Sequence, residues 1–145
     1  MILSSTDEKT QKNLLGKNIK ERADVIRWCS LSNNDLNSAL RCILFRLDGK
    51  TPYHKEQVDA AFEQVETIAQ FYETRLEQST FLVAERITAG DIMSFGTWSV
   101  AFSRVCDTDF RIKYPHLVQW FNAVKVSEYF KKSFADFKFI EKINL

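Results

Sequence analysis

Glycine and proline are scarce in this sequence, with four glycines and two prolines among 145 residues. Disordered, linker-like and collagen-like chains are rich in one or both residues, so the composition excludes these classes. Hydrophobic residues make up 45% of the chain and aromatic residues 13%, including 12 phenylalanines. We therefore expect one domain with a packed core, because a chain of this length buries most of its apolar surface.

An excess of charge of one sign is also missing, because 20 Lys and Arg residues stand against 19 Asp and Glu residues. The densest basic stretch, at Lys131 and Lys132, is interrupted by Glu128 and Asp136. Binding to a phosphate backbone depends on clustered cations. We interpret this stretch as a solvated helix face and expect no nucleic-acid partner.

Paired cysteines and long apolar runs are absent as well. Cys29, Cys42 and Cys106 are odd in number, lack CxxC spacing and lie in apolar stretches, which favours reduced core thiols of an intracellular protein. The sequence contains no apolar run near the roughly 20 residues that cross a membrane. Its first residues lack the apolar segment of a signal peptide. We expect a cytoplasmic protein without a membrane partner.

The residue patterns of common catalytic and metal sites do not occur. His54 and His116 each lie close to a proline at a helix start, and neither has Cys, Asp or Glu at ligand spacing. Nucleophile elbows, P-loops and dinucleotide fingerprints are missing. Asp107 and Asp109 read as ionised turn residues. We therefore expect no catalytic residue, no cofactor-binding residue and no metal ligand in this chain.

Helical periodicity covers most of what is present. Asn18 and Glu21 have capping-box spacing and begin a helix that we expect to run to about Leu47. The polar stretch 30–37 in its middle is either a solvated face or a polar wall of a cleft. A second helix, 55–78, has apolar residues at alternating steps of four and three: Val58, Phe62, Val65, Ala69, Tyr72 and Leu76.

A third helix, 89–106, is apolar on every side and is predicted to be central. Thr88 and Asp91 form a capping box at its start, in which each residue's side chain accepts a hydrogen bond from the other's backbone. Gly90 and Gly96 are expected to let a neighbouring backbone approach closely. We interpret this region as a structural signal for the helix start.

The remaining segments complete an all-α prediction. Pro115 begins a fourth helix, and Ser127 caps a short fifth helix that ends near Phe134. The tail that follows alternates phenylalanine with charge, and we expect an extended segment lying over the helices. Residues 1–17 are predicted to be a linker or lead-in, and residues 18–145 a single helical domain with an extended C-terminal tail.

This order of signals resembles the C-terminal helical half of the glutathione S-transferase superfamily. The segments "ERADVIRW", "FLVAERITAGD" and "YPHLVQWFNAV" carry the resemblance, which extends from Leu14 to about Lys142. Within the superfamily the chain is most similar to the GST-like domain of fungal elongation factor 1-gamma. The resemblance implies a GST C-terminal-like bundle of about five helices.

The resemblance also implies what this sequence does not contain. In the superfamily a thioredoxin-like α/β half precedes these helices and supplies the glutathione site and the catalytic residue, so we expect no catalysis by this chain alone. Glutathione is expected as a ligand only together with that half. By itself the chain would contribute one wall of an apolar pocket, formed by Trp28, Ser32, Asn33, Trp98 and Arg104.

Three functions remain open at this point, one of them that of a GST-like relative that has no role in translation and serves only dimerisation. The resemblance implies a protein-interaction and scaffolding module that docks the nucleotide-exchange subunit of elongation factor 1, and hence a role in translation elongation. The alternative is the C-terminal half of a glutathione transferase that contributes the pocket for the electrophile. A homodimer is a further expectation, because a helical half without its α/β half should expose an apolar patch.

Overall fold

The computed structural model describes residues 8–144, and over these residues it is helical without β-strands. The all-α class predicted from the sequence is confirmed. The elements are, in chain order, α1 (Glu8–Leu15), α2 (Ile19–Ser30), a π-helical segment (Leu31–Leu36), α3 (Asn37–Leu47), α4 (Lys55–Leu76), α5 (Ala89–Arg104), α6 (Thr108–Lys113) and α7 (Pro115–Lys125).

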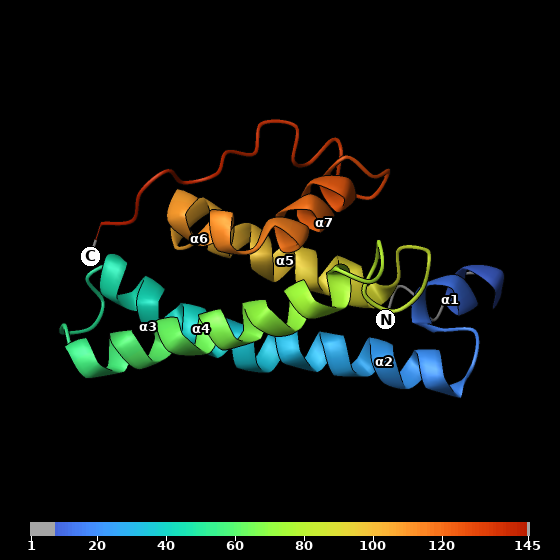
Figure 1. Cartoon of the computed structure of the whole chain (residues 1–145), viewed down its shortest axis with the longest axis horizontal. Helices are drawn as coiled ribbons and strands as arrows, with labels where there is room; N and C mark the ends of the chain where they lie inside the picture. Colours follow the sequence, from blue (N-terminus) through green and yellow to red (C-terminus); the bar gives the residue numbers. More distant parts are fainter. Residues whose placement is uncertain (1–7, 145) are drawn as a thin grey trace.

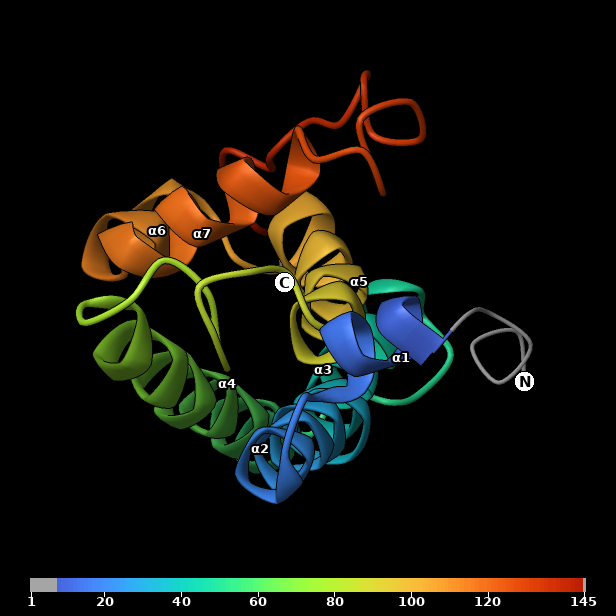
Figure 2. The same cartoon turned by 90° about the vertical axis from the view of Figure 1, so that its right-hand side faces the viewer.

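Two long helical rods form the base of the molecule. Helices α2 and α3 are joined without a break through the π-helical segment, so the predicted first helix is confirmed, and α4 returns alongside this rod (Figure 1). Figure 2 looks along the rods. In this view α5 lies beside α2, and α6 and α7 lie on the side of α4 that is away from α2. Helices α5 and α7 pack on one another and so complete the bundle.

The core lies between these helices and is rich in aromatic rings. The ring of Tyr72 on α4 lies 4.7 Å from that of Trp28, 5.5 Å from that of Trp98 and 6.1 Å from that of Trp120. All four side chains are almost completely buried. The apolar stripe predicted for α4 faces this core, because Val58, Val65, Ala69, Tyr72 and Leu76 are buried and Phe62 is partly buried.

Helix α5 differs from the prediction on one side. Most of its apolar side chains are buried, but Met93, Gly96 and Val100 are exposed along one face, so the expectation of a helix covered all round is wrong there. An added Cβ at Gly96 would have no neighbour within 4 Å, whereas one at Gly90 would lie 3.4 Å from Cβ of Trp28. Of the two glycines of α5, Gly90 and not Gly96 therefore packs closely against a neighbouring element.

The two ends of the described chain also differ from the sequence-based expectation. Residues expected to form a linker include helix α1, whose Leu14 is buried. The short helix expected from Ser127 to Phe134 is wrong: this segment forms consecutive turns that contain both i→i−3 and i→i−4 hydrogen bonds. The segment contains few strong helix formers, so its backbone follows the packing of Phe130 and Phe134 on the ring of Phe95.

Candidate functional site

The stretch that begins α5 is organised around one buried carboxylate. Thr88 has an extended backbone at the N-cap and forms a capping box with Asp91. The Asp91 carboxylate accepts hydrogen bonds from the Thr88 N–H (2.9 Å) and hydroxyl (3.2 Å), and also from the Leu82 N–H (3.1 Å) and the Trp120 indole (2.8 Å). Asp91 thus joins the 77–88 segment, α5 and α7.

The electrostatics of this carboxylate fit a structural role. Burial raises the pKa of Asp91, and the hydrogen bonds from Thr88, Trp120 and Leu82 oppose the rise. These donors occupy both carboxylate oxygens. Asp91 is also 0% exposed, so a substrate cannot reach the carboxylate to exchange a proton with it. Asp91 therefore stabilises the junction of three segments.

The partly buried thiol of Cys29, the buried thiol of Cys106 and the central phenol of Tyr72 are held in their protonated forms. Burial raises the pKa of the Cys29 thiol and raises that of the Cys106 thiol well above its ordinary value. Burial also raises the pKa of Tyr72, whose hydroxyl lies 2.8 Å from that of Ser94. Activated nucleophiles have a lowered pKa, so these three groups are poor candidates for nucleophilic catalysis.

The five residues predicted to line one pocket wall are dispersed. Ser32 and Trp98 are completely buried, with the Ser32 hydroxyl 2.8 Å from that of Thr97. Arg104 pairs with Asp48 at the end of α3. Trp28 and Asn33 face two different grooves. The five side chains thus have different surroundings in the structure, and their role as one pocket wall stays a prediction.

An exposed apolar surface lies along α2 and α5, and we call it the α2–α5 face. A shallow groove of about 310 Å³ brings Leu15, Ile26 and Ala89 together. Met93 lies four residues after Ala89, and Val100 lies seven residues after Met93. The three residues therefore lie on the same side of α5. The α2–α5 face consists of Leu15, Ile26, Met93 and Val100, which are 36%, 66%, 40% and 40% exposed.

A second, larger groove of about 790 Å³ runs between α2 and α4. It is mostly apolar, and its lining includes Trp28, Leu31 and the exposed ring of Phe71. Asp35 and Arg75 also border it, so its rim carries both signs of charge. Its size and its apolar lining match sites that take up a small molecule or a protruding side chain.

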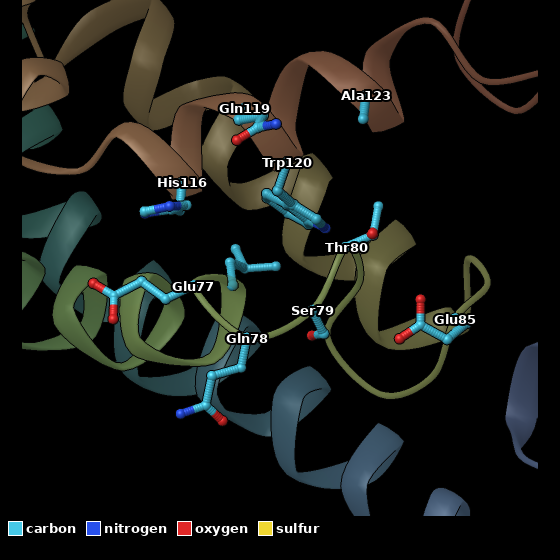
Figure 3. Close-up of a pocket in the computed structure, with 10 residues that line it drawn as sticks. Glu77, Gln78, Ser79, Thr80, Glu85, His116, Gln119, Trp120 and Ala123 are labelled. Carbon is cyan, nitrogen blue, oxygen red and sulfur yellow. The ribbon is translucent and has the colours of Figure 1, made fainter.

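A third hollow, of about 430 Å³, lies between the end of α4, the segment that follows it and α7 (Figure 3). Its lining is mainly polar and includes Glu77, Gln78, Ser79, Glu85, His116 and Gln119. In Figure 3, Glu77, the C-cap residue of α4, and His116 from α7 lie at the same end of the hollow. Sequence spacing could not indicate this pair, because the two residues are 39 positions apart (116 − 77).

Helices able to span a bilayer were not found among residues 8–144, where each helix is too short or too polar.

Comparison with known proteins identifies relatives along nearly the whole chain. Residues 36–128 match the family described as glutathione S-transferase, C-terminal domain. Elongation factor 1-gamma 2 of Saccharomyces cerevisiae is 36% identical over 136 residues, which cover 94% of this chain and 33% of that protein. Glutathione S-transferase AN1595 of Emericella nidulans is 29% identical over 142 residues, which cover 98% of this chain and 53% of that enzyme.

A solved structure agrees with these sequence matches. The GST-like domain of elongation factor 1-gamma from Saccharomyces cerevisiae superposes with a TM-score of 0.91 at 34% identity, covering 97% of this chain and 66% of that one. The chain therefore spans about a third of the elongation factor relative and two thirds of the solved domain. The fold that the resemblance implied is confirmed.

Proposed function

Because the chain belongs to the glutathione S-transferase C-terminal domain family, we propose that it is a protein-interaction module of the elongation factor 1-gamma type. The observation that carries the proposal is the likeness to a GST-like domain of elongation factor 1-gamma over almost the whole chain. In this role the module acts in translation elongation as a scaffold, and it contributes binding surfaces without catalytic groups.

The surface chemistry of the described residues supports a binding role. The α2–α5 face exposes four large apolar side chains on adjacent helices, and contiguous apolar surface of this kind is typical of protein contacts. The α/β half predicted by the resemblance would cover this face in a longer protein. The candidate nucleophiles, by contrast, are held in protonated form by burial.

The proposed partner is the nucleotide-exchange subunit of elongation factor 1. A pull-down at low salt tests the proposal, with the natural full-length protein on the resin and the purified exchange subunit in solution. We expect stoichiometric retention. Failure of the folded protein to retain the subunit would contradict the proposal, and an unrelated glutathione transferase of similar charge serves as the matched control.

The alternative function is a glutathione transferase, for which the likeness to the enzyme from Emericella nidulans is the favouring observation. In this case the helices supply the pocket for the electrophile once glutathione is bound by another part of the protein. Conjugation of glutathione to a chromogenic electrophile by the natural full-length protein tests the alternative. Absence of turnover together with absence of retention on glutathione resin would exclude it.

A further inference from the structure

Glu73, near the end of α4, is a carboxylate held in place by the start of α7. Its Oε2 accepts the backbone N–H of Leu117 at 2.8 Å, and its Oε1 accepts the backbone N–H of His116 at 3.1 Å. The same Oε1 lies 2.7 Å from Nδ1 of the His116 ring. Only 5% of Glu73 is exposed, so its position is fixed by these contacts.

The contacts of Glu73 leave much of its negative charge unbalanced. Two of the three partners are neutral backbone N–H groups at a helix N-terminus, which favour an anion through partial charges only. The third is an imidazole, which carries a full charge only when it is protonated. A buried carboxylate with such partners is a good ligand for a cation that can reach it.

Glu77 is the C-cap residue of α4 and, four positions after Glu73, lies on the same face as Glu73. One carboxylate oxygen from each glutamate and one ring nitrogen of His116 all lie within 4.8 Å of one another. We propose that Glu73, Glu77 and His116 form a zinc-binding site that joins the end of α4 to the start of α7. This proposal goes beyond the interaction role described above and does not depend on it.

The donor set decides which cation the site takes. Imidazole nitrogen and carboxylate oxygen are both ligands of Zn²⁺, at about 2.0–2.2 Å, whereas Mg²⁺ and Ca²⁺ prefer oxygen atoms only. Two carboxylates also balance the charge of Zn²⁺ when the imidazole is neutral. The neutral imidazole binds the metal through its unprotonated ring nitrogen, so only the imidazolium form has to release a proton to solvent on binding.

The surroundings of the three side chains allow the ligands to close around the ion. Glu77 is exposed and free to rotate, whereas Glu73 is preorganised by the α7 backbone. The hollow of about 430 Å³ borders both Glu77 and His116 and gives water access to a fourth coordination position (Figure 3). The result is an open site with three protein ligands, two of them separated by one helical turn.

Isothermal titration of the folded, tag-free chain with zinc chloride tests the proposal. We expect one Zn²⁺ per chain and a higher melting temperature in the presence of zinc, because the ion binds the native state. Glu77→Gln should weaken binding at least about tenfold, which is the lower range for loss of a metal-site contact. Glu63→Gln, an exposed substitution elsewhere on α4, should leave binding unchanged.

Two further measurements keep the result decisive. His116→Gln should also weaken zinc binding. If the His116→Gln variant folds poorly, Glu77→Gln decides the test, because Glu77 is exposed and its substitution leaves the fold intact. The absorption spectrum of the Co²⁺ form should contain no thiolate charge-transfer band. Such a band would show that the metal binds at Cys29 or Cys42 instead. The proposal is overturned if zinc does not bind saturably, or if Glu77→Gln and His116→Gln bind it like the wild type.

Discussion

Four hydrogen-bond donors from three residues meet at the carboxylate of Asp91. Two of them, both from Thr88, belong to the local capping box. The other two, from Leu82 and Trp120, reach it from the preceding segment and from α7. Loss of this acceptor would leave several buried donors without a partner, and each such donor carries its own desolvation cost.

Asp91→Ala should therefore lower the free energy of unfolding by more than a simple cap would, by about 3 kcal/mol or more. Asn18 provides the matched control, because its exposed side chain accepts a single backbone hydrogen bond at the start of α2. Asn18→Ala should cost about 1 kcal/mol. Urea denaturation measures both variants, and equal losses would show that Leu82 and Trp120 add nothing to the cap.

Glu21 makes stability depend on acid pH. The hydrogen bond from Arg86, followed by that from the Lys17 N–H, lowers the pKa of Glu21 from 4.5 to about 2. A carboxyl whose pKa is lower in the folded state stabilises the fold above its unfolded pKa, and this contribution disappears as the pH falls through the folded pKa. The affected window thus runs from 4.5 down to about 2.

Glu21→Gln should flatten the loss of stability across this window, because glutamine does not titrate. The measurement is the unfolding free energy of both proteins at several pH values between pH 5 and pH 2, which span about the window given by linkage. Glu63→Gln, an exposed change on α4, should follow the wild-type curve. A Glu21→Gln curve parallel to the wild type would contradict the assignment.

The sequence predicted the contacts between residues that are close in the chain, but not the contacts between distant residues, and the reason is physical. Thr88 and Asp91 are three positions apart, so their hydrogen bond follows from helix geometry alone. The bond from Trp120 to Asp91 and the meeting of Glu73 with His116 depend on how α7 packs across the bundle. Periodicity indicates which helices form but does not fix such a crossing.

At the scale of elements, the expectations that were confirmed rest on local periodicity, and those that were corrected depend on packing between distant residues. Helix α4 has one strict apolar stripe, and its buried face was predictable. Helix α5 has apolar residues on all sides, so its sequence could not reveal that Met93 and Val100 stay exposed. The C-terminal segment forms turns because ring packing decides its course, and ring packing involves residues distant in sequence.

Gly96 offers a test of the exposed side of α5. An added Cβ there meets nothing within 4 Å, so Gly96→Ala should raise the free energy of unfolding by about 0.5–1 kcal/mol, the helix-propensity difference between the two residues. Gly90→Ala is the counterpart, and its Cβ would contact Trp28, Thr88 and Val83. Its gain should be smaller or negative. A destabilising Gly96→Ala in urea denaturation would place another element against this side of α5.

At the scale of the whole molecule, the chain combines a fully formed aromatic core with an uncovered apolar face. The core residues of α4, α5 and α7 are buried by one another, so the helical domain needs no further part to complete them. The α2–α5 face, by contrast, leaves Ile26 and Val100 in contact with solvent. This division is typical of a domain whose stability resides in its interior and whose outer surface binds other protein surfaces.

The central claim is that this domain serves a protein complex. Titration of the natural full-length protein with the nucleotide-exchange subunit of elongation factor 1, at low salt and followed by calorimetry, tests it most directly. The account predicts saturable binding with one exchange subunit per chain. A folded protein that shows no saturable binding of the exchange subunit under these conditions would contradict it.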